Sequence, residues 1–183
     1  MTAPHFVALG GTTRAGSSTE RALVAALGLA EARGARTTLL GAEALGLPHY
    51  APENANRTEA AVHLVSTLRS ADAIIIGSPG YHGALSGLVK NALDYVEDTS
   101  GDPRCYFSGV PVGCIATAAG WQAAVATLGQ LRAIVHALRG WPTPLGVAIN
   151  SIPASPGEDV IGAPATRQQL GLLVDQQFEF LRR

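Results

Sequence analysis

Hydroxyl side chains gather around one arginine near the start of the chain, in the segment GGTTRAGSSTE at positions 10–20. The hydroxyl side chains of this segment are Thr12, Thr13, Ser17, Ser18 and Thr19, and the arginine is Arg14. A helical pattern begins at its end, and a helix N-terminus offers free backbone N–H groups and the positive end of a dipole. With the hydroxyl groups and the guanidinium, these donors suit the end of a phosphate monoester. The alternative is a plain Ser/Thr helix cap with surface hydroxyls, and the segment alone does not separate the two.

Comparison with two known phosphate-binding motifs indicates which kind of phosphate group this segment suits. No Gly-Lys-Ser/Thr follows the segment, as a P-loop requires, and the dinucleotide pattern G-x-G-x-x-G is missing. The dinucleotide pattern lets a pyrophosphate lie against bare backbone, whereas a loop rich in hydroxyls wraps a terminal phosphate. The sequence therefore favours a mononucleotide.

A second unusual loop, SPGYHG at positions 78–83, follows the apolar run ADAIII. An ordinary strand-to-helix turn needs only a few residues and a cap. Glycines here allow a flat ring to lie on the main chain, with the N–H groups of residues 80–83 facing a heterocycle that carries oxygen and nitrogen atoms along one edge. Tyr81 adds an aromatic surface. His82 is open to two interpretations, as a general base or as a residue that hydrogen-bonds locally or lines the pocket.

Five apolar runs alternate with five helical patterns, and these elements must position the two loops. The predicted strands are 5–10, 36–41, 71–78, 111–118 and 142–151, and the predicted helices are 18–34, 57–71, 84–98, 121–140 and 166–183. The runs are continuously apolar, which is typical of parallel strands covered on both faces. The pattern predicts an α/β, flavodoxin-like three-layer sandwich with a five-stranded parallel sheet in the order 2-1-3-4-5, as a single domain over residues 1–183. Ligands of such folds bind beyond the strands where the order reverses, here between the first and third strands, which the two loops follow.

Composition excludes several classes of protein. The formal net charge of -1 gives no reason to expect a nucleic-acid partner. The sequence has no run of about 18 apolar residues, so no membrane span is predicted. Cys105 and Cys114 form no CxxC pair, so we expect a reduced, cytoplasmic protein. The five histidines show no ligand spacing, so no metal site is predicted. Only 15% of residues are charged, which hints at a homo-oligomer.

Taken together, GGTTRAGSST at 10–19 and GSPGYHGALSGLVKNALDYVED at 77–98 resemble the NADPH-dependent FMN reductase family, flavoproteins of flavodoxin-like fold that reduce quinones, azo compounds and chromate. The second match is long and contiguous. In the first, Thr12 stands where serine is usual and Thr19 where asparagine is usual. The resemblance covers the element order of the whole chain.

This resemblance implies a set of cofactor-binding residues, FMN being the cofactor and NADPH its reductant. It assigns the FMN phosphate to Thr12, Arg14, Ser17, Ser18 and Thr19, the ring to Pro79, Gly80, Tyr81, His82 and Gly83, and a small-residue turn beside the ring to Thr117, Ala118, Ala119 and Gly120. Gly80 departs from the family's usual glutamate, which removes a carboxylate beside the flavin. Trp121 also departs, either as a wall of the substrate pocket, as an interface aromatic or as the start of a helix.

The implied function is ping-pong hydride transfer from NADPH through FMN to a small-molecule acceptor, which is a quinone, an azo compound, a metal oxyanion or free flavin. No catalytic side chain is assigned, because the flavin carries the chemistry. The implied assembly is a homodimer or homotetramer in which the helix at 84–98 helps to form the contact. Two alternatives stay open, a flavodoxin-type electron carrier and a flavin-dependent tailoring enzyme. Carriers are usually strongly acidic, unlike this chain.

Overall fold

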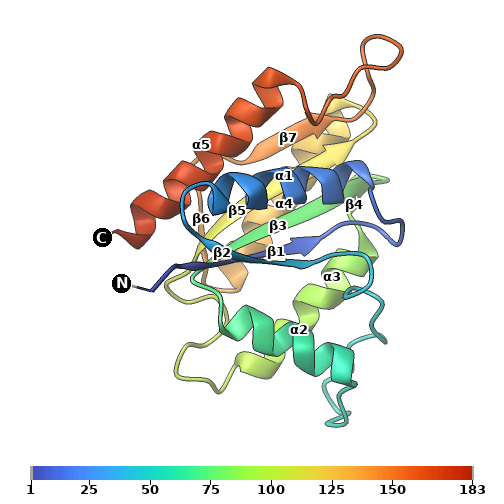
Figure 1. The fold of residues 1–183 in the computed structure, drawn as a ribbon. Helices are drawn as coiled ribbons and strands as arrows, with labels where there is room; N and C mark the ends of the chain where they lie inside the picture. The colour runs from blue at the N-terminus through green and yellow to red at the C-terminus, as the bar shows by residue number, and fades with distance from the viewer. Residues whose placement is uncertain (1, 183) are drawn as a thin grey trace.

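A parallel sheet with helices on both faces makes up the fold of this computed structural model, which describes residues 2–182 (Figure 1). The strands of the sheet are β1 His5–Gly10, β2 Arg36–Leu40, β3 Ala73–Tyr81, β5 Pro111–Ala118, β6 Trp141–Pro142 and β7 Val147–Asn150. The helices are α1 Ser18–Glu31, α2 Glu59–Arg69, α3 Gly87–Asp94, α4 Trp121–Ala137 and α5 Pro164–Leu181. A short strand β4, Ala84–Leu85, precedes α3, and a 3-10 helix η1, Tyr95–Thr99, follows it.

The strand order is β2-β1-β3-β5-β6, with β7 also paired to β5. Counting β5 as the fourth strand and β6 with β7 as the fifth, this is the predicted order 2-1-3-4-5, and the predicted α/β flavodoxin-like class is confirmed. The fifth strand differs from expectation, because it is broken between Pro142 and Val147. Pro142 and Pro144 lack the backbone N–H that a continuous ladder would need. The single FMN-binding domain over 1–183 stays a prediction, and its two terminal residues lie outside the described range.

Two hydrophobic layers hold the helices to the sheet. On one face, α1 and α5 bury side chains such as Leu23, Leu27 and Leu173 against β1, β3 and β5. On the other, α2, α3 and α4 bury side chains such as Leu64 and Leu131. Side chains from alternate positions of β3 enter the two layers, which explains why its sequence is apolar without interruption. Figure 1 shows α1 and α5 side by side on one side of the sheet and α2 with α3 on the other.

The long segment 41–58 between β2 and α2 is fastened to the α3 side of the molecule. The Arg57 guanidinium donates from Nε and Nη2 to the two carboxylate oxygens of Asp98, at 2.7 and 2.8 Å, and lies over the Tyr50 ring, 4.7 Å from its centroid. These bonds hold the pKa of the Asp98 carboxyl below its usual value. Asn91 of α3 accepts from the Tyr50 N–H at 2.8 Å. The segment is therefore ordered although it contains neither helix nor strand.

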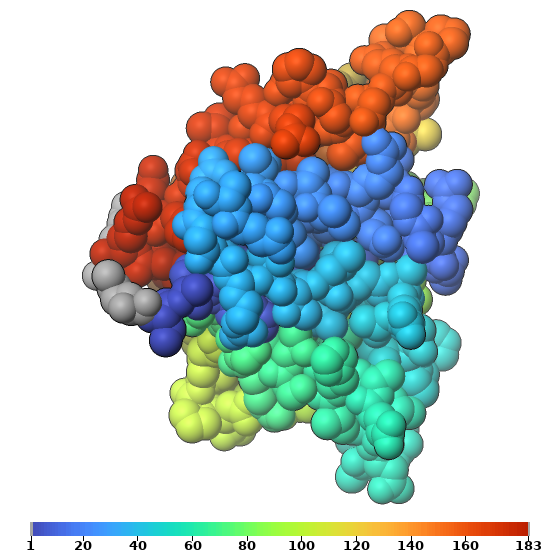
Figure 2. Space-filling view, in the orientation of Figure 1, coloured from blue at the N-terminus to red at the C-terminus, as the bar shows by residue number. Residues whose placement is uncertain are grey.

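Different parts of the chain lie at the two ends of the sheet. At the amino end, the start of β6 meets the end of α5, where the Trp141 and Phe180 ring centroids are 6.1 Å apart. The chain termini lie at this end in Figure 1, and the loops that follow β1, β3 and β5 lie at the opposite end. The segment 152–163 before α5 projects beside those loops at the top of Figure 2. Within residues 2–182, none of the helices has the length and apolarity needed to cross a bilayer, and no three metal-ligand side chains are grouped.

Candidate functional site

The end of β1 and the middle of β3 approach each other more closely than a side chain would allow. Gly10 is paired with Gly77, and a Cβ added to Gly10 would lie 1.9 Å from the Gly77 carbonyl oxygen. Gly10 also has φ 145°. The next residue, Gly11, donates its N–H to the same carbonyl at 3.3 Å. The loop that leaves β1 therefore starts directly beside the middle of β3.

The first predicted phosphate residues form a tight turn at the surface. The Thr12 hydroxyl accepts from the Arg14 N–H and donates to the Arg14 carbonyl, both at 3.1 Å. The Arg14 side chain is exposed. Thr12 thus shapes the turn, and the guanidinium is left at the rim of the loop.

Ser17 is the N-cap of α1, as the cap interpretation of this segment expects. Its hydroxyl accepts from the Glu20 N–H at 3.3 Å, and the residue is buried. Ser18 occupies the first helical position and is half-buried. Because the cap uses the N–H of Glu20, the N–H groups of Ser18 and Thr19 stay available at the positive end of the helix.

A buried hydrogen bond joins the first loop to the end of β5. The hydroxyl oxygens of Thr19 and Thr117 are 2.6 Å apart, and the residues are only 1% and 3% exposed. Thr19 belongs to the predicted phosphate set and Thr117 to the small-residue turn predicted beside the ring, and the two residues lie 98 positions apart in the sequence. The structure therefore brings these two sets together at one edge of the sheet.

The loop after β3 is a β-hairpin, which corrects the expected loop at 79–83 and helix start at Ala84. Pro79 to Tyr81 continue β3, and Ala84–Leu85 return as β4. His82 and Gly83 form the turn with φ 50° and 87°, the double positive φ of a type I′ turn. Histidine is among the residues enriched at positive φ, so the turn itself accounts for His82. Both residues and Tyr81 are exposed.

A glutamine of α4 fastens this hairpin. Gln130 donates from Nε2 to the Gly83 carbonyl at 2.7 Å and accepts from the Leu85 N–H through Oε1 at 3.0 Å. The turn residue Gly83 and the returning strand β4 are thus tied to one side chain. The hairpin is held by a helix that lies 45 positions later in the chain.

Gly80 has a packing role besides the predicted contact with the ring. An added Cβ would lie 2.6 Å from Thr127 Oγ1 and 3.2 Å from the Ala118 Cβ. Glycine is therefore needed here because α4 and the end of β5 approach the strand. A glutamate, the family's usual residue, would require these neighbours to move.

The loop after β5 is fixed by the last strand of the sheet. Gly120 donates its N–H to Ala118 O and to Asn150 Oδ1, both at 3.0 Å. Asn150 also accepts from the Ile152 N–H at 3.1 Å, so it joins two loops. Ala118 is buried, Ala119 is exposed, and Trp121, the first residue of α4, is 61% exposed. The tryptophan therefore faces outward next to the site.

Each of the three loops contains one glycine that is open to approach from outside. Gly16, Gly83 and Gly120 have positive φ values of 70°, 87° and 125°, and no heavy atom lies within 4 Å of a Cβ added to any of them. Backbone at such positions can contact a ligand directly. With the donors of α1 and the exposed Tyr81, this set fits a phosphorylated planar cofactor such as FMN.

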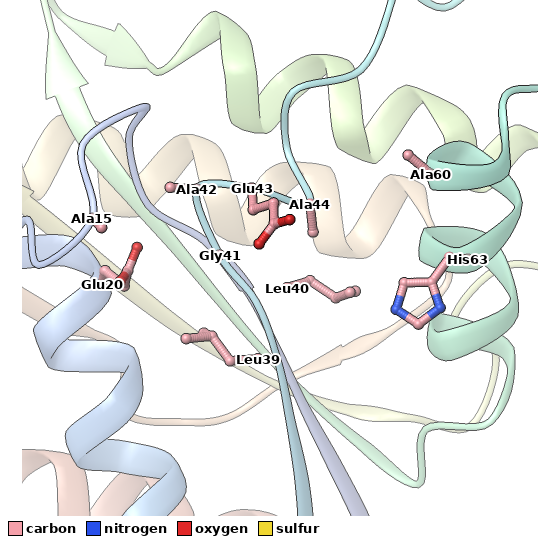
Figure 3. Close-up of a pocket in the computed structure, with 10 residues that line it drawn as sticks. All are labelled: Ala15, Glu20, Leu39, Leu40, Gly41, Ala42, Glu43, Ala44, Ala60 and His63. Carbon is pink, nitrogen blue, oxygen red and sulfur yellow. The ribbon is translucent and has the colours of Figure 1, made fainter.

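A cavity of about 580 Å³ adjoins the first loop on the side of β2 (Figure 3). Figure 3 shows Glu20 at one end, near Ala15, and His63 of α2 at the other, with Glu43 between them. Glu20 Oε1 accepts from the Gly16 N–H at 3.2 Å. A carboxylate therefore lies next to the loop that was predicted to hold a phosphate.

Sequence reasoning missed Glu20, Gln130 and Asn150. Asn150 carried a usable signal, a polar side chain at the end of the last predicted strand. Glu20 stands three residues after a serine cap, the spacing of a capping box. Gln130 lies within a helical pattern, and nothing near it in the sequence points to the hairpin.

Comparison with known proteins identifies the family. A family profile described as NADPH-dependent FMN reductase matches residues 4–153. An FMN-dependent NADPH-azoreductase of Staphylococcus aureus is 37% identical over 90 residues, which are 49% of this chain and 44% of that relative. The aligned segment thus spans less than half the length of this curated relative.

Solved structures show the fold. The flavoenzyme NAD(P)H:(acceptor) oxidoreductase FerB of Paracoccus denitrificans has a TM-score of 0.80 at 21% identity, over 98% of this chain and 97% of that one. A flavodoxin of Streptococcus pneumoniae TIGR4 has a TM-score of 0.62 at 10% identity, over 95% and 98% of the two chains. Since reductases and a flavodoxin share it, the fold alone does not separate an enzyme from a carrier.

The family profile adds the family to the fold. It confirms the expected class, flavin-dependent NAD(P)H oxidoreductases, with the pairing of FMN and NADPH that the description implies. Because the matched residues include most of the chain and all three loops of the site, this chain belongs to the NADPH-dependent FMN reductase family.

Proposed function

We propose that this chain is an FMN-dependent NAD(P)H oxidoreductase that reduces a small-molecule acceptor by ping-pong hydride transfer. The observation that carries the proposal is the buried Thr19–Thr117 hydrogen bond. It joins the start of α1, at the end of the segment suited to a phosphate, to the end of β5, which is assigned to lie beside the ring, inside the region that the family profile matches. The acceptor class is a quinone, an azo compound, a metal oxyanion or free flavin.

The phosphate would be held by the first loop and the start of α1. The residues assigned to it are Thr12, Arg14, Ser17, Ser18 and Thr19. Arg14 supplies the positive charge at the rim, and the free N–H groups of the first helical turn supply directed donors. Ser17 and Thr12 act indirectly, because their hydroxyls already hold the cap and the turn.

The ring would lie between the hairpin and the loop after β5. The residues assigned to it are Pro79, Gly80, Tyr81, His82, Gly83, Thr117, Ala118, Ala119 and Gly120. FMN supplies the hydride chemistry when it is bound, and we assign no catalytic side chain. The hairpin turn, tied by Gln130 at Gly83 and Leu85, presents backbone groups in fixed positions. Fixed donors stabilise negative charge on a bound ring without having to reorganise.

The assembly would be a homodimer or homotetramer. Trp121 and Val125 stand one helical turn apart on α4 and are 61% and 58% exposed, and Tyr81 of the hairpin is 52% exposed. Large apolar side chains grouped beside a site favour contact with another chain. Light scattering of the purified protein measures the mass, and Trp121→Glu is expected to lower it. We also place the protein in the cytoplasm, where its two free cysteines would stay reduced.

An anaerobic titration tests the proposal. The protein is loaded with FMN and freed of excess, and its visible spectrum is followed during addition of NADPH or NADH and then of each acceptor class. We expect the flavin band to bleach with nicotinamide and to return with at least one acceptor. Bleaching by dithionite alone would make the chain a carrier, and failure to retain FMN would refute the assigned site.

A pair of threonine variants tests the site itself. Thr19→Val removes one hydroxyl of the Thr19–Thr117 hydrogen bond and is expected to weaken FMN binding. Thr143→Val is the control, because Thr143 is equally buried but bonds to Leu145 O between β6 and β7. Equal FMN affinity in the two variants would contradict the role of the Thr19–Thr117 bond.

A further inference from the structure

We propose that Glu20 competes with the cofactor phosphate for the first loop, and so limits how strongly this chain prefers FMN to riboflavin. The inference rests on the proposed function, because it assumes that this loop receives the phosphate. It concerns a residue that the assigned FMN set does not include.

The Glu20 side chain reaches into the loop rather than back to the helix cap. In a capping box, the glutamate at the third helical position accepts from the N–H of the cap residue itself. Here Ser17 is the cap, and Glu20 Oε1 instead accepts from the N–H of Gly16, one residue earlier. Gly16 is the open glycine of this loop, with positive φ and no heavy atom within 4 Å of an added Cβ. A carboxylate thus uses the backbone donor at the point where the loop is most accessible.

The second carboxylate oxygen lies beneath the loop. Oε2 is 3.7 Å from a Cβ built on Gly11 and 3.3 Å from one built on Gly41, so it lies between the ends of β1 and β2. It is buried and has no hydrogen-bond partner among residues 2–182. Leaving such an oxygen without a donor is unfavourable. The half-satisfied carboxylate is therefore weakly held and can leave the loop at little cost.

Little positive charge near the loop offsets this carboxylate. Arg21, the next residue of α1, is paired with Asp159. Arg14 is exposed at the rim. A phosphate monoester that enters the loop therefore meets the negative charge of Glu20, and the guanidinium of Arg14 is the one nearby group that offsets it. Like charges at short range repel even in a partly screened site. The cavity of about 580 Å³ that Glu20 lines gives the displaced carboxylate room to turn toward β2 (Figure 3).

The test compares two ligands that differ only in the phosphate. FMN and riboflavin are titrated into cofactor-free protein, and the dissociation constants are measured from flavin fluorescence. Glu20→Gln keeps an oxygen that can accept from Gly16 and removes the charge. We expect it to bind FMN about tenfold more tightly, equivalent to about 1.4 kcal/mol, with riboflavin affinity unchanged.

Two further variants separate charge from geometry. Glu59→Gln makes the same substitution at an exposed first-turn glutamate of α2 and is expected to leave both affinities unchanged. Glu20→Asp keeps the charge and is expected to stay within about threefold of the wild-type FMN affinity.

The outcomes distinguish the inference from the function on which it rests. If the wild type binds FMN and Glu20→Gln binds it equally well, or strengthens riboflavin binding to the same degree, the inference is wrong and the proposed function stands. Tenfold tightening in Glu20→Asp would show that loop geometry sets the affinity, and would also overturn the inference. If neither the wild type nor Glu20→Gln binds a flavin, the proposed function fails and the inference fails with it.

Discussion

Replacing Gln130 with alanine isolates the contribution of one side chain to the hairpin after β3. The change removes two hydrogen bonds, to the Gly83 carbonyl and from the Leu85 N–H. Each is worth about 1 kcal/mol net, so the turn loses about 2 kcal/mol. His82 at φ 50° adds a conformation that an unsupported turn would leave readily. The perturbation is therefore concentrated on a turn to which the ring of FMN is assigned.

FMN affinity and thermal stability should both fall. A loss of about 2 kcal/mol corresponds to roughly thirtyfold weaker FMN binding if the whole cost is paid on binding. It corresponds to a melting temperature lower by about 4–8 °C for a domain of this size. Flavin fluorescence and a thermal melt measure the two effects. Gln130→Glu should give an intermediate result, because a carboxylate still accepts from Leu85 but cannot donate to Gly83.

An exposed glutamine of α5, Gln169, provides the control. Gln169→Ala removes the same side chain from a helix without touching the hairpin, and it should leave FMN affinity unchanged. Wild-type FMN affinity in Gln130→Ala would refute the reasoning, because it would mean that the turn keeps its conformation without its bonds. A fall in the melting temperature alone would limit the role of Gln130 to stability.

Three other predictions follow from the packing. Gly80→Ala would place a Cβ 2.6 Å from Thr127 Oγ1 and should cost about 2 kcal/mol of stability; adding Thr127→Ala should restore part of it in a thermal melt. Burial lowers the pKa of His5 from 6.5, so the neutral ring contributes stability that is present above about pH 6.5 and is lost as the pH falls through the lower folded pKa. The melting temperature should therefore fall more steeply between pH 7 and 5 in the wild type than in His5→Gln. Equal slopes in the two proteins would contradict this. Burial raises the pKa of Cys114 to about 12, so a thiol reagent should label half-buried Cys105 alone in the native protein and both cysteines after unfolding; mass spectrometry that finds native Cys114 modified would contradict this.

The sheet could be predicted from the sequence because its strands carry a local signal. Residues 5–10 and 111–118 were expected as strands and are strands with the same bounds. Both are buried on two faces, so every residue apart from His5 is apolar or small, and breakers mark their ends. The alternation with helices then left few orders for a parallel sheet. The location of the candidate site followed from that order.

The hairpin and its support could not be predicted in the same way. Pro79 and Gly80 read as loop residues, yet they continue β3 because Pro79 pairs with Thr117 of β5 and Gly80 pairs with Leu85 of β4. For Pro79, and for the bonds from Gln130 to the hairpin, a contact between distant positions decides the local conformation, and a window of neighbouring residues does not contain that contact. The segment 142–151 read as one strand, although its prolines interrupt the ladder.

Glu20 shows a related limit. The segment 10–20 was weighed as a phosphate loop or as a helix cap, and the structure shows that one stretch has the features of both. Ser17 caps α1, while Gly16 and the first helical turn stay open. Glu20 takes part in both features, because its N–H donates to the Ser17 cap and its carboxylate lies at the predicted phosphate loop. The sequence does not show where this carboxylate lies.

The separation between the two ends of the sheet has a practical consequence for attaching this protein to other objects. β1 begins and α5 ends at the amino edge, near Trp141 and Phe180, whereas the loops assigned to the cofactor lie at the carboxyl edge (Figure 1). A fusion partner, an affinity resin or an electrode coupled through either terminus would therefore meet the molecule on the side away from its site. Immobilised protein should keep its loops open to dissolved reagents, whichever terminus carries the link.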